Sequence, residues 1–469
     1  MLLPSCVLLA ACATPSVAVR PAPEVVEVAV VGGGLAGLVT AYELKQRGID
    51  ARVLEASDRL GGRVATAEYG PGLQAEYGLE ELWEKSPLLE LARKLNVPLE
   101  EEGTFSSVLL DGKLHAFTQD TNDAFFDSLF TPAERAAQRR FFERAEALFL
   151  LKRDSPELNA LAAISFAQWL EQEQVPPRVA KWVRLTLECE LGATAEEFSA
   201  LFGLVELRTF LFDGEHAFHV VGGNGRLIDA LGTALAGRTT LRARVSSIER
   251  HRDAKGDWLV TVHYLRDGKL ETLRARRVVV TVPWLMLHLI ALTPPLPPSA
   301  QLAMASLGRG QYAVVHLVID KAAHQLWGGA EARPFPVLTD GPLGVVYGVR
   351  SLSPKEQPNE VFSLLIHGAY ARAFHLVPHE RKRDEVVAEL DKLWPGFSQH
   401  VRGSAVFTYH PAAIPFWPPG RSPFDAQAEG LFQSFDGLFL AGDWLVNSHS
   451  EGAVLAAQRQ ATAIAAELR

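Results

Sequence analysis

A strand-length apolar run followed by closely spaced glycines constrains this chain more than any other feature of its sequence. Residues 25–31 are almost all apolar and rich in valine, as expected for a parallel strand that is buried on both faces. A GxGxxG pattern follows directly, and it consists of Gly32, Gly34 and Gly37. Apolar residues then recur at helical spacing up to Gly48, and a second apolar strand, 51–54, ends at Glu55. This order predicts a βαβ unit that binds a dinucleotide.

The glycines of this unit have different physical tasks. Gly32 permits a tight turn, Gly34 lets the backbone approach a pyrophosphate, and Gly37 allows the helix to pack closely on the strand. The helix begins near Leu35 and Ala36, so its free N–H groups face the negative charge of the phosphates. The turn and the start of the helix are therefore predicted to bind the cofactor.

The residues that begin with Glu55 indicate which dinucleotide is bound. The carboxylate of Glu55 would accept hydrogen bonds from the ribose hydroxyls of adenosine. The residues that we assign to the cofactor in the next stretch are Ala56, Arg59, Gly61, Gly62 and Arg63. Adjacent glycines expose backbone N–H groups, and arginines offer charge-assisted donors to phosphate. The stretch resembles the Arg-x-Gly-Gly-Arg element of the flavin-containing amine oxidase, phytoene desaturase and protoporphyrinogen oxidase superfamily, and this resemblance implies FAD.

The C-terminal end of the chain resembles the same superfamily. A short apolar strand at 437–441 leads into Gly442 and Asp443, and we expect the last helix over 454–468. Its start carries three further candidate flavin-binding residues, Glu451, Gly452 and Ala453. In the family these two elements close over the flavin: the Asp443 carboxylate would bond the ribityl or pyrophosphate region, and the helix N-terminus would face the flavin edge that becomes negative on reduction.

The resemblance covers residues 25–468 and implies both the fold class and the division of the chain into two domains. Within it, the backbone of Val245 is predicted to receive the adenine. The implied fold class is α/β, with a Rossmann-like FAD-binding domain built on a central parallel sheet and interleaved with an α+β substrate domain. The predicted segments are 25–101, 220–291 and 401–469 for the FAD-binding domain, and 102–219 and 292–400 for the substrate domain.

Two positions depart from the family's amine oxidases. In those enzymes a lysine on the first strand of the substrate sheet holds a water near the flavin, and here Tyr312 occupies the aligned position. No lysine lies between Lys269 and Lys321, so a small alignment error does not restore it. The family also places an aromatic cage residue two positions before the Glu-Gly-Ala motif, and here that residue is His449.

These departures decide which functional hypothesis we prefer. The first is an FAD-dependent oxidoreductase in which hydride passes from a small, apolar or amphipathic substrate to non-covalent FAD, as in the desaturase branches. His449 and Tyr312 are the candidate catalytic residues, and His410 is a further candidate for accepting a proton. The first alternative is a flavin amine oxidase that produces hydrogen peroxide. The second alternative is a flavin-binding accessory lipoprotein without catalytic activity.

Composition and cysteine content exclude several other classes. The chain has 46 basic and 55 acidic residues, a net charge of −9 and no basic block, which argues against a nucleic-acid partner. Its three cysteines have neither the spacing of a zinc site nor the number for a disulfide framework, so no metal is expected. None of them lies near the C-terminal flavin segment, which excludes a thioether-linked FAD.

The first 24 residues form a leader with two interpretations. Leu9-Ala10-Ala11-Cys12 resembles the lipid-attachment box of a bacterial lipoprotein signal, but no basic residue precedes Arg20. The protein is therefore either anchored to a membrane through a lipid on Cys12 or cytoplasmic with a disordered leader. The sequence carries no signal for the oligomeric state.

Overall fold

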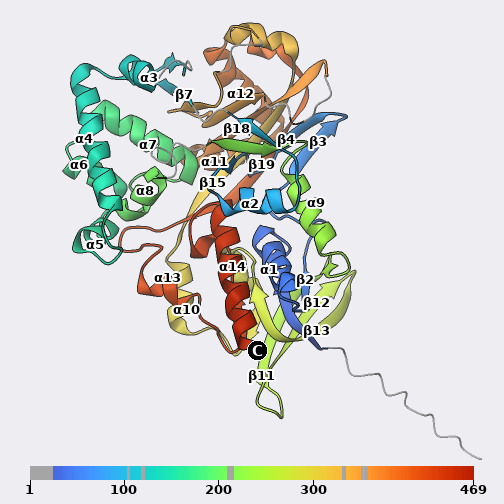
Figure 1. The fold of residues 1–469 in the computed structure, drawn as a ribbon. Coiled ribbons are helices and arrows are strands. Elements are labelled where there is room, and N and C mark those ends of the chain that lie inside the picture. Colours follow the sequence, from blue (N-terminus) through green and yellow to red (C-terminus); the bar gives the residue numbers. More distant parts are fainter. Residues whose placement is uncertain are drawn as a thin grey trace, which may run out of the picture.

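The structure is a computed structural model, and it separates a cofactor domain from a substrate domain (Figure 1). It describes residues 25–102, 106–117, 122–208, 216–329, 334–349, 352 and 357–469. The leader, with Cys12, lies outside the described residues. Among the described residues, no helix is long and apolar enough to cross a membrane.

The cofactor domain is built on a sheet whose central part is parallel. The parallel strands, in spatial order, are β10 (Thr239–Thr240), β2 (Ala51–Leu54), β1 (Val25–Val31), β13 (Lys269–Val280) and β20 (Leu438–Leu440). β1 and β2 have the bounds that the sequence predicted, and their inward valines are fully buried because layers of helices cover the sheet.

An antiparallel meander extends this sheet. It consists of β11 (Arg244–Arg252), β12 (Trp258–Arg266) and the first half of β13, and β14 (Ala291–Thr293) pairs with β11. The second half of β13 pairs with β20 instead, so one long strand belongs to both the meander and the parallel layer.

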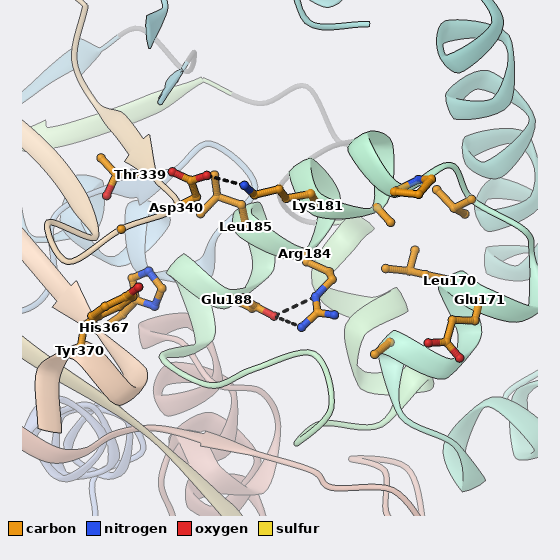
Figure 2. A pocket seen from close by; sticks show the side chains of 15 residues that line it. Leu170, Glu171, Lys181, Arg184, Leu185, Glu188, Thr339, Asp340, His367 and Tyr370 are labelled. Carbon is orange, nitrogen blue, oxygen red and sulfur yellow. Dashed lines mark hydrogen bonds and ion pairs between the residues drawn. The ribbon is translucent and has the colours of Figure 1, made fainter. Parts of the chain in front are cut away.

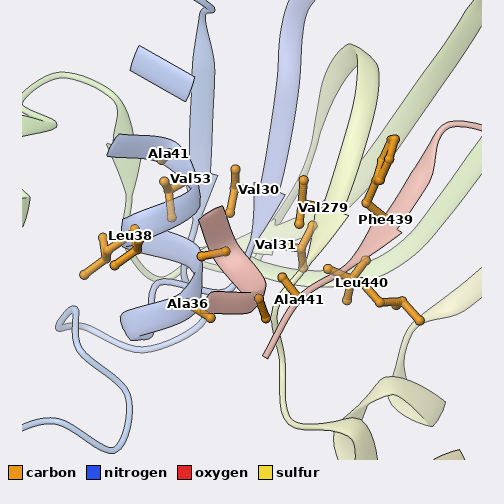
Figure 3. Close-up of a cluster of buried hydrophobic side chains, with 14 of the residues drawn as sticks. Val30, Val31, Ala36, Leu38, Ala41, Val53, Val279, Phe439, Leu440 and Ala441 are labelled. Atoms are coloured by element: carbon orange, nitrogen blue, oxygen red, sulfur yellow. The ribbon is translucent and has the colours of Figure 1, made fainter. Parts of the chain in front are cut away.

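Helices from the start, middle and end of the chain share one hydrophobic core with the parallel strands. They are α1 (Leu35–Gln46), α2 (Pro87–Lys94), α9 (Gly225–Ala234) and α14 (Ser450–Glu467). α1 and α14 lie side by side although they are more than 400 residues apart in sequence (Figure 1). Figure 3 shows the core between helix and sheet, where Ala41 of α1 lies near Val53 and Val30. Gly48, with φ of +79°, lies just beyond α1, as predicted.

The substrate domain contains a second, mostly antiparallel sheet. Its strands, in spatial order, are β19 (Val401–Phe416), β15 (Gly308–Asp320), β18 (Asn359–His367), β17 (Val345–Val349), β16 (Val337–Thr339), β7 (Ser107–Leu110) and β8 (Lys113–His115). Because β19 pairs with β15, residues 401–416 lie in this sheet and not in the FAD-binding domain to which we assigned them. Residues 296–304, which we assigned to the substrate domain, instead contribute buried side chains to the cofactor-domain core.

Helices cover both faces of the second sheet. One face packs against α3 (Asn122–Leu129), α4 (Pro132–Phe149), α5 (Pro156–Ala163), α6 (Phe166–Gln172), α7 (Pro177–Leu191) and α8 (Ala200–Leu207). The other face packs against α11 (Gly368–Leu376) and α12 (His379–Leu393). α4 begins with a capping box in which the side chains of Thr131 and Glu134 each accept a hydrogen bond from the other residue's backbone N–H, with Pro132 at the first helical position.

Short elements connect the two domains. They are the hairpin of β3 (Thr66–Gly70) and β4 (Leu73–Glu76), and the small sheet of β5 (Leu82–Trp83), β9 (Ala217–Val220) and β6 (Leu99–Glu102). Glu76 is 2% exposed and accepts hydrogen bonds from the backbone N–H of Asn224 and from the hydroxyl of Thr66. This buried carboxylate ties the hairpin to the turn that begins α9.

Candidate active site

Two glycines of the first turn are required by close contacts within the protein, and a third has free space beside it. Gly32 has φ of +112°, and a Cβ added to it would lie 2.6 Å from Oγ1 of Thr281. A Cβ on Gly37 would lie 1.9 Å from the carbonyl oxygen of Gly32. Gly34 differs, because its φ is −74° and the atom nearest to an added Cβ is the Cα of Gly62, 4.0 Å away. The space beside Gly34 is therefore open to a ligand.

The N-terminus of α1 is prepared for an anion. Gly34 is its N-cap and provides no side-chain hydrogen bond, and the first turn contains no acidic residue. Leu35 and Ala36 are buried there, so their backbone N–H groups are fixed in position. The second glycine turn packs against the first, since the N–H of Gly61 donates to the carbonyl of Gly33 at 2.8 Å. Two loops of small residues and one helix terminus thus surround the place where a pyrophosphate would bind.

Glu55 lies where an adenosine ribose would be recognised. Its carboxylate accepts hydrogen bonds from the backbone N–H of Gly33 at 2.6 Å and of Ser57 at 2.7 Å. A carboxylate has about four acceptor sites, so sites remain for ribose hydroxyls. The N–H of Ala243 donates to the carbonyl of Glu55, which brings the start of β11, with Val245, close to this carboxylate. The structure therefore brings together the residues that we expected at the adenosine end.

The two arginines that follow lie in different places. Ala56 and Arg59 are exposed, and the Arg59 guanidinium donates to the carbonyl of Gly62 in its own loop at 2.9 Å. Arg63 instead forms a two-point ion pair with Asp443, with N–O distances of 2.7 and 2.8 Å. The sequence predicted that Arg63 and Asp443 each bind the cofactor directly. The structure shows that Arg63 binds and orients the carboxylate of Asp443, whose side chain is only 6% exposed.

The last helix begins four residues before its predicted start at 454. Its first turn therefore contains the three candidates from this segment, Glu451, Gly452 and Ala453. A Cβ on Gly452 would lie 2.3 Å from the side-chain oxygen of Asn447, so this glycine is required by the close approach of the preceding loop. His449 is the N-cap, and its side chain does not cap the helix. The first-turn N–H groups of α14 are thus not capped by the side chain that precedes them.

The side chain of His449 instead forms an ion pair in the substrate domain. Its Nε2 lies 2.7 Å from an Oε of Glu206 in α8, and the Glu206 side chain is 2% exposed. Burial alone would lower the pKa of His449, but the charge and hydrogen bond of Glu206 and the charges of Glu190 and Glu451 raise it to about 9. His449 is therefore an imidazolium at neutral pH.

A second carboxyl group lies beside this pair. Burial raises the pKa of Glu190, at the end of α7, to about 7, against the opposing charge of His449 and together with the negative charges of Glu81 and Glu206. We refer to Glu190, Glu206 and His449 as the inner cluster. These three groups alone, one imidazolium and two carboxyl groups, carry zero to one negative charge near neutral pH, and the charges of Glu81 and Glu451 also act on them, so the inner cluster can accept a cation.

Tyr312 has a structural hydrogen bond. Its hydroxyl donates to the carbonyl of Cys189 at 2.7 Å, and the residue is 6% exposed. Burial, with the negative charges of Glu190 and Glu206, raises its pKa well above the usual value for a tyrosine. The proton of this phenol is therefore held, which argues against the catalytic role that we assigned to Tyr312 from its position.

His410 pairs with Tyr312 across β15 and β19, and its Nε2 lies 3.2 Å from the carbonyl of Tyr77. Burial is the main cause that lowers the pKa of His410. A neutral imidazole this close to a carbonyl donates its ring N–H to it, so this nitrogen is not free to accept a proton. Of the three predicted proton acceptors, only His449 belongs to the inner cluster.

Comparison with known proteins identifies the family. The sequence model described as flavin containing amine oxidoreductase matches residues 35–465. The chain belongs to this family.

The relatives of this flavin-containing amine oxidoreductase include oxidases of several amines. Polyamine oxidase 4 from Oryza sativa subsp. japonica is 25% identical over 377 residues, which cover 78% of the chain and 73% of the relative. The flavin-dependent L-tryptophan oxidase RebO from Lentzea aerocolonigenes is 28% identical over 307 residues, or 57% of the chain and 60% of the relative. In fold, the chain is similar to cyclohexylamine oxidase from Brevibacterium oxydans IH-35A, with a TM-score of 0.76 and 22% identity over 95% of this chain and 100% of that one.

The flavin-containing amine oxidoreductase is thus an FAD-dependent enzyme, and the alternative of a protein without catalytic activity does not hold. The open face of Gly34 and the N-terminus of α1 fit the pyrophosphate of FAD, and the N-terminus of α14 fits its flavin end. Among the described residues the one cysteine is Cys189, which is buried in α7 and not in the C-terminal flavin segment.

Sequence reasoning missed Glu190 and Glu206. Glu206 interrupts the apolar stretch of α8 and is 1% exposed, although an acidic residue in such a stretch must be paired or coordinated when it is buried. That interruption was the available signal. Its partner, His449, lies 243 residues away in sequence, so the pairing could be found only from the folded chain.

Proposed function

We propose that this FAD-dependent oxidoreductase oxidises a small amine at the carbon atom next to the nitrogen. The observation that carries the proposal is the inner cluster, in which the buried carboxylate of Glu206 pairs with the imidazolium of His449 and the partly buried carboxyl group of Glu190 lies within the field of that pair. A site with this charge attracts an ammonium group and gives no advantage to an uncharged polyene. The named relatives, a polyamine oxidase and an L-tryptophan oxidase, act on amines and support the same substrate class.

The chain's own residues can manage the proton of this reaction. An amine arrives largely as the alkylammonium ion and must lose one proton from nitrogen before it can lose hydride from the adjacent carbon. Glu190, with a pKa of about 7, can accept that proton at neutral pH. FAD, when bound, accepts the hydride with both electrons of the carbon–hydrogen bond, and the substrate is left as the iminium ion, with a carbon–nitrogen double bond. Glu206 holds His449 in place, so Glu190 remains the carboxyl group that is free to exchange a proton.

Anaerobic flavin bleaching tests the proposed substrate class. We expect amines to bleach the flavin absorbance of the FAD-loaded protein, and polyenes and porphyrinogens to leave it unchanged. The apolar substrate that the sequence favoured makes the opposite prediction. Bleaching by polyenes or porphyrinogens alone would overturn the proposal.

Replacing Glu190 by glutamine should weaken the binding of the amine. Glutamine keeps the shape of the side chain but removes the negative charge, and a hydrogen bond to a charged group contributes about 1.5–3 kcal/mol. We expect KM for the amine to rise about tenfold or more, and the acidic limb of the kcat/KM profile, near pH 7, to disappear. Glu146→Gln, an exposed change on α4, is the matched control. Unchanged KM and an unchanged pH profile in E190Q would contradict the role of Glu190.

We also propose that the chain is attached to a membrane through a lipid on Cys12. The support is the Leu9-Ala10-Ala11-Cys12 sequence alone. In a bacterial host, metabolic labelling with palmitate should mark the full-length protein and should not mark Cys12→Ser, which should move to the soluble fraction. An unmodified chain that retains residues 1–11 by mass spectrometry would overturn this proposal and leave the cytoplasmic interpretation.

A further inference from the structure

A cavity of about 510 Å³ lies between the helices and the sheet of the substrate domain. α7 contributes lining residues from Pro177 to Glu188 at spacings of three and four, so one face of the helix forms a wall about 16 Å long. Figure 2 shows Leu170 of α6 on one side of α7 and His367 and Tyr370 on the other. We refer to this space as the outer cavity.

The outer cavity is separated from the inner cluster by a thin wall. His367 lines the cavity, and its Nε2 lies 3.4 Å from the Sγ of Cys189, whose carbonyl accepts the hydrogen bond from Tyr312. Glu188 faces the outer cavity and Glu190, two residues further along α7, belongs to the inner cluster. The last turn of α7 thus has a carboxyl group on each side, and the two sites are distinct but adjacent.

The charges that line the outer cavity favour a cation. Its basic side chains are held by two carboxylates each, Lys181 by Asp111 and Asp340, and Arg184 by Glu188 and Glu196. Glu171 adds an exposed carboxylate without a basic partner among the described residues. Burial lowers the pKa of His367 to about 4, so its imidazole adds no positive charge at neutral pH. Among the lining residues, Glu171, Glu188 and Asp340 are acidic and Lys181 and Arg184 are basic, so the acidic groups of the lining exceed the basic groups by one.

The rest of the lining is apolar and aromatic. Leu170, Val175, Ala180 and Leu185 form an apolar surface, and the ring of Tyr370 lies at the opposite side. Apolar surface favours a hydrocarbon body, and the face of an aromatic ring favours a cationic group. The size of the cavity is within the range of small-molecule sites.

We propose that the outer cavity is a second binding site for organic cations with an apolar body, the protonated form of the amines that the inner site would oxidise. The choice of amines as the ligand rests on the proposed function, but the binding of the cation itself does not. A second amine site next to the first would hold substrate close to the wall formed by Cys189, Tyr312 and His367.

Isothermal titration with phenethyltrimethylammonium tests this proposal on the FAD-loaded enzyme. This probe has an apolar body and a fixed positive charge, and its quaternary nitrogen has no lone pair with which to form an iminium. We expect binding that survives Glu190→Gln in the inner cluster. Ala180→Phe, which fills the cavity, should weaken binding at least about tenfold. Ala136→Phe adds the same side chain to an exposed position of α4 and should leave binding unchanged.

A charge change tests the same site without a risk to folding. Glu171 is exposed, so its replacement by lysine should not disturb the fold. Glu171→Lys should weaken binding of the probe about fivefold, because it removes the excess of acidic groups in the lining. If neither A180F nor E171K weakens binding, or if E190Q alone abolishes it, the outer cavity is not the site. Amine bleaching of the flavin is measured in parallel. Bleaching without a second cation site would retain the proposed function and exclude the outer site, and the reverse result would retain the outer site alone.

Discussion

Replacing Gly34 by valine is expected to abolish FAD binding while the protein remains folded. The backbone of Gly34 has an ordinary φ of −74°, and an added Cβ meets no protein atom closer than 4.0 Å. The valine side chain would instead occupy the space of the pyrophosphate. Loss of two or three hydrogen bonds to a charged group, at about 1.5–3 kcal/mol each, corresponds to a decrease in affinity of at least about 100-fold.

The measurement is the FAD content of the purified protein, followed by titration of the apoprotein with FAD. Gly430→Val is the matched control, because a Cβ at Gly430 also meets nothing within 4 Å and its φ is not positive. Both variants should keep the circular dichroism spectrum of the parent, and only Gly34→Val should be colourless. A yellow G34V protein with unchanged affinity would show that the pyrophosphate does not approach this turn.

The sequence was sufficient for the parts of the cofactor domain in which each residue acts through its own backbone. Gly32 is required by its own φ of +112°, Gly37 is required by the carbonyl oxygen of Gly32 five residues earlier, and the strand at 25–31 needs only its own apolar side chains to be buried. Such local requirements leave a pattern that can be recognised before the fold is known. The order of strand, turn and helix therefore predicted β1, α1 and β2 with little error.

The sequence was insufficient where side chains choose between partners. The ion pair of Arg63 with Asp443 and that of His449 with Glu206 each join residues more than 200 positions apart. Arg63 and Asp443 also had an expected partner in the cofactor, and composition does not decide between the two partners. The domain boundary at 400 failed for a related reason, because the pairing of β19 with β15 depends on sheet register and not on the apolar pattern of β19 itself.

The pair of His449 with Glu206 should make stability depend on pH in a defined window. The pKa of His449 is raised in the folded protein from 6.5 to about 9, so the folded state binds the proton more tightly than the unfolded state. Its contribution is fully present below pH 6.5 and is lost as the pH rises through about 9. At about 1.4 kcal/mol per pH unit, the contribution is roughly 3 kcal/mol at most.

The variant Glu206→Gln isolates this contribution. Without the Glu206 carboxylate the pKa of His449 falls, because burial is then opposed only by the charges of Glu190 and Glu451. We expect the difference in free energy of unfolding between the parent and E206Q to shrink by roughly 2–3 kcal/mol between pH 6.5 and pH 9, as measured by urea denaturation at several pH values. An inflection near pH 9 in the flavin absorbance of the parent should move to lower pH in the variant, because His449 is the N-cap of the helix that faces the flavin.

Glu101→Gln provides the control for this pH dependence. Glu101 also pairs with a histidine, His216, but both side chains are more than half exposed, and such surface pairs contribute little. This variant should follow the parent at every pH and keep its flavin inflection. A constant difference in stability between E206Q and the parent from pH 6.5 to 9, together with an unmoved inflection, would mean that His449 is neutral in the folded protein. In that case the inner cluster would hold two carboxyl groups without a compensating cation. The ammonium group of the substrate would then be the only positive charge among the groups of the cluster.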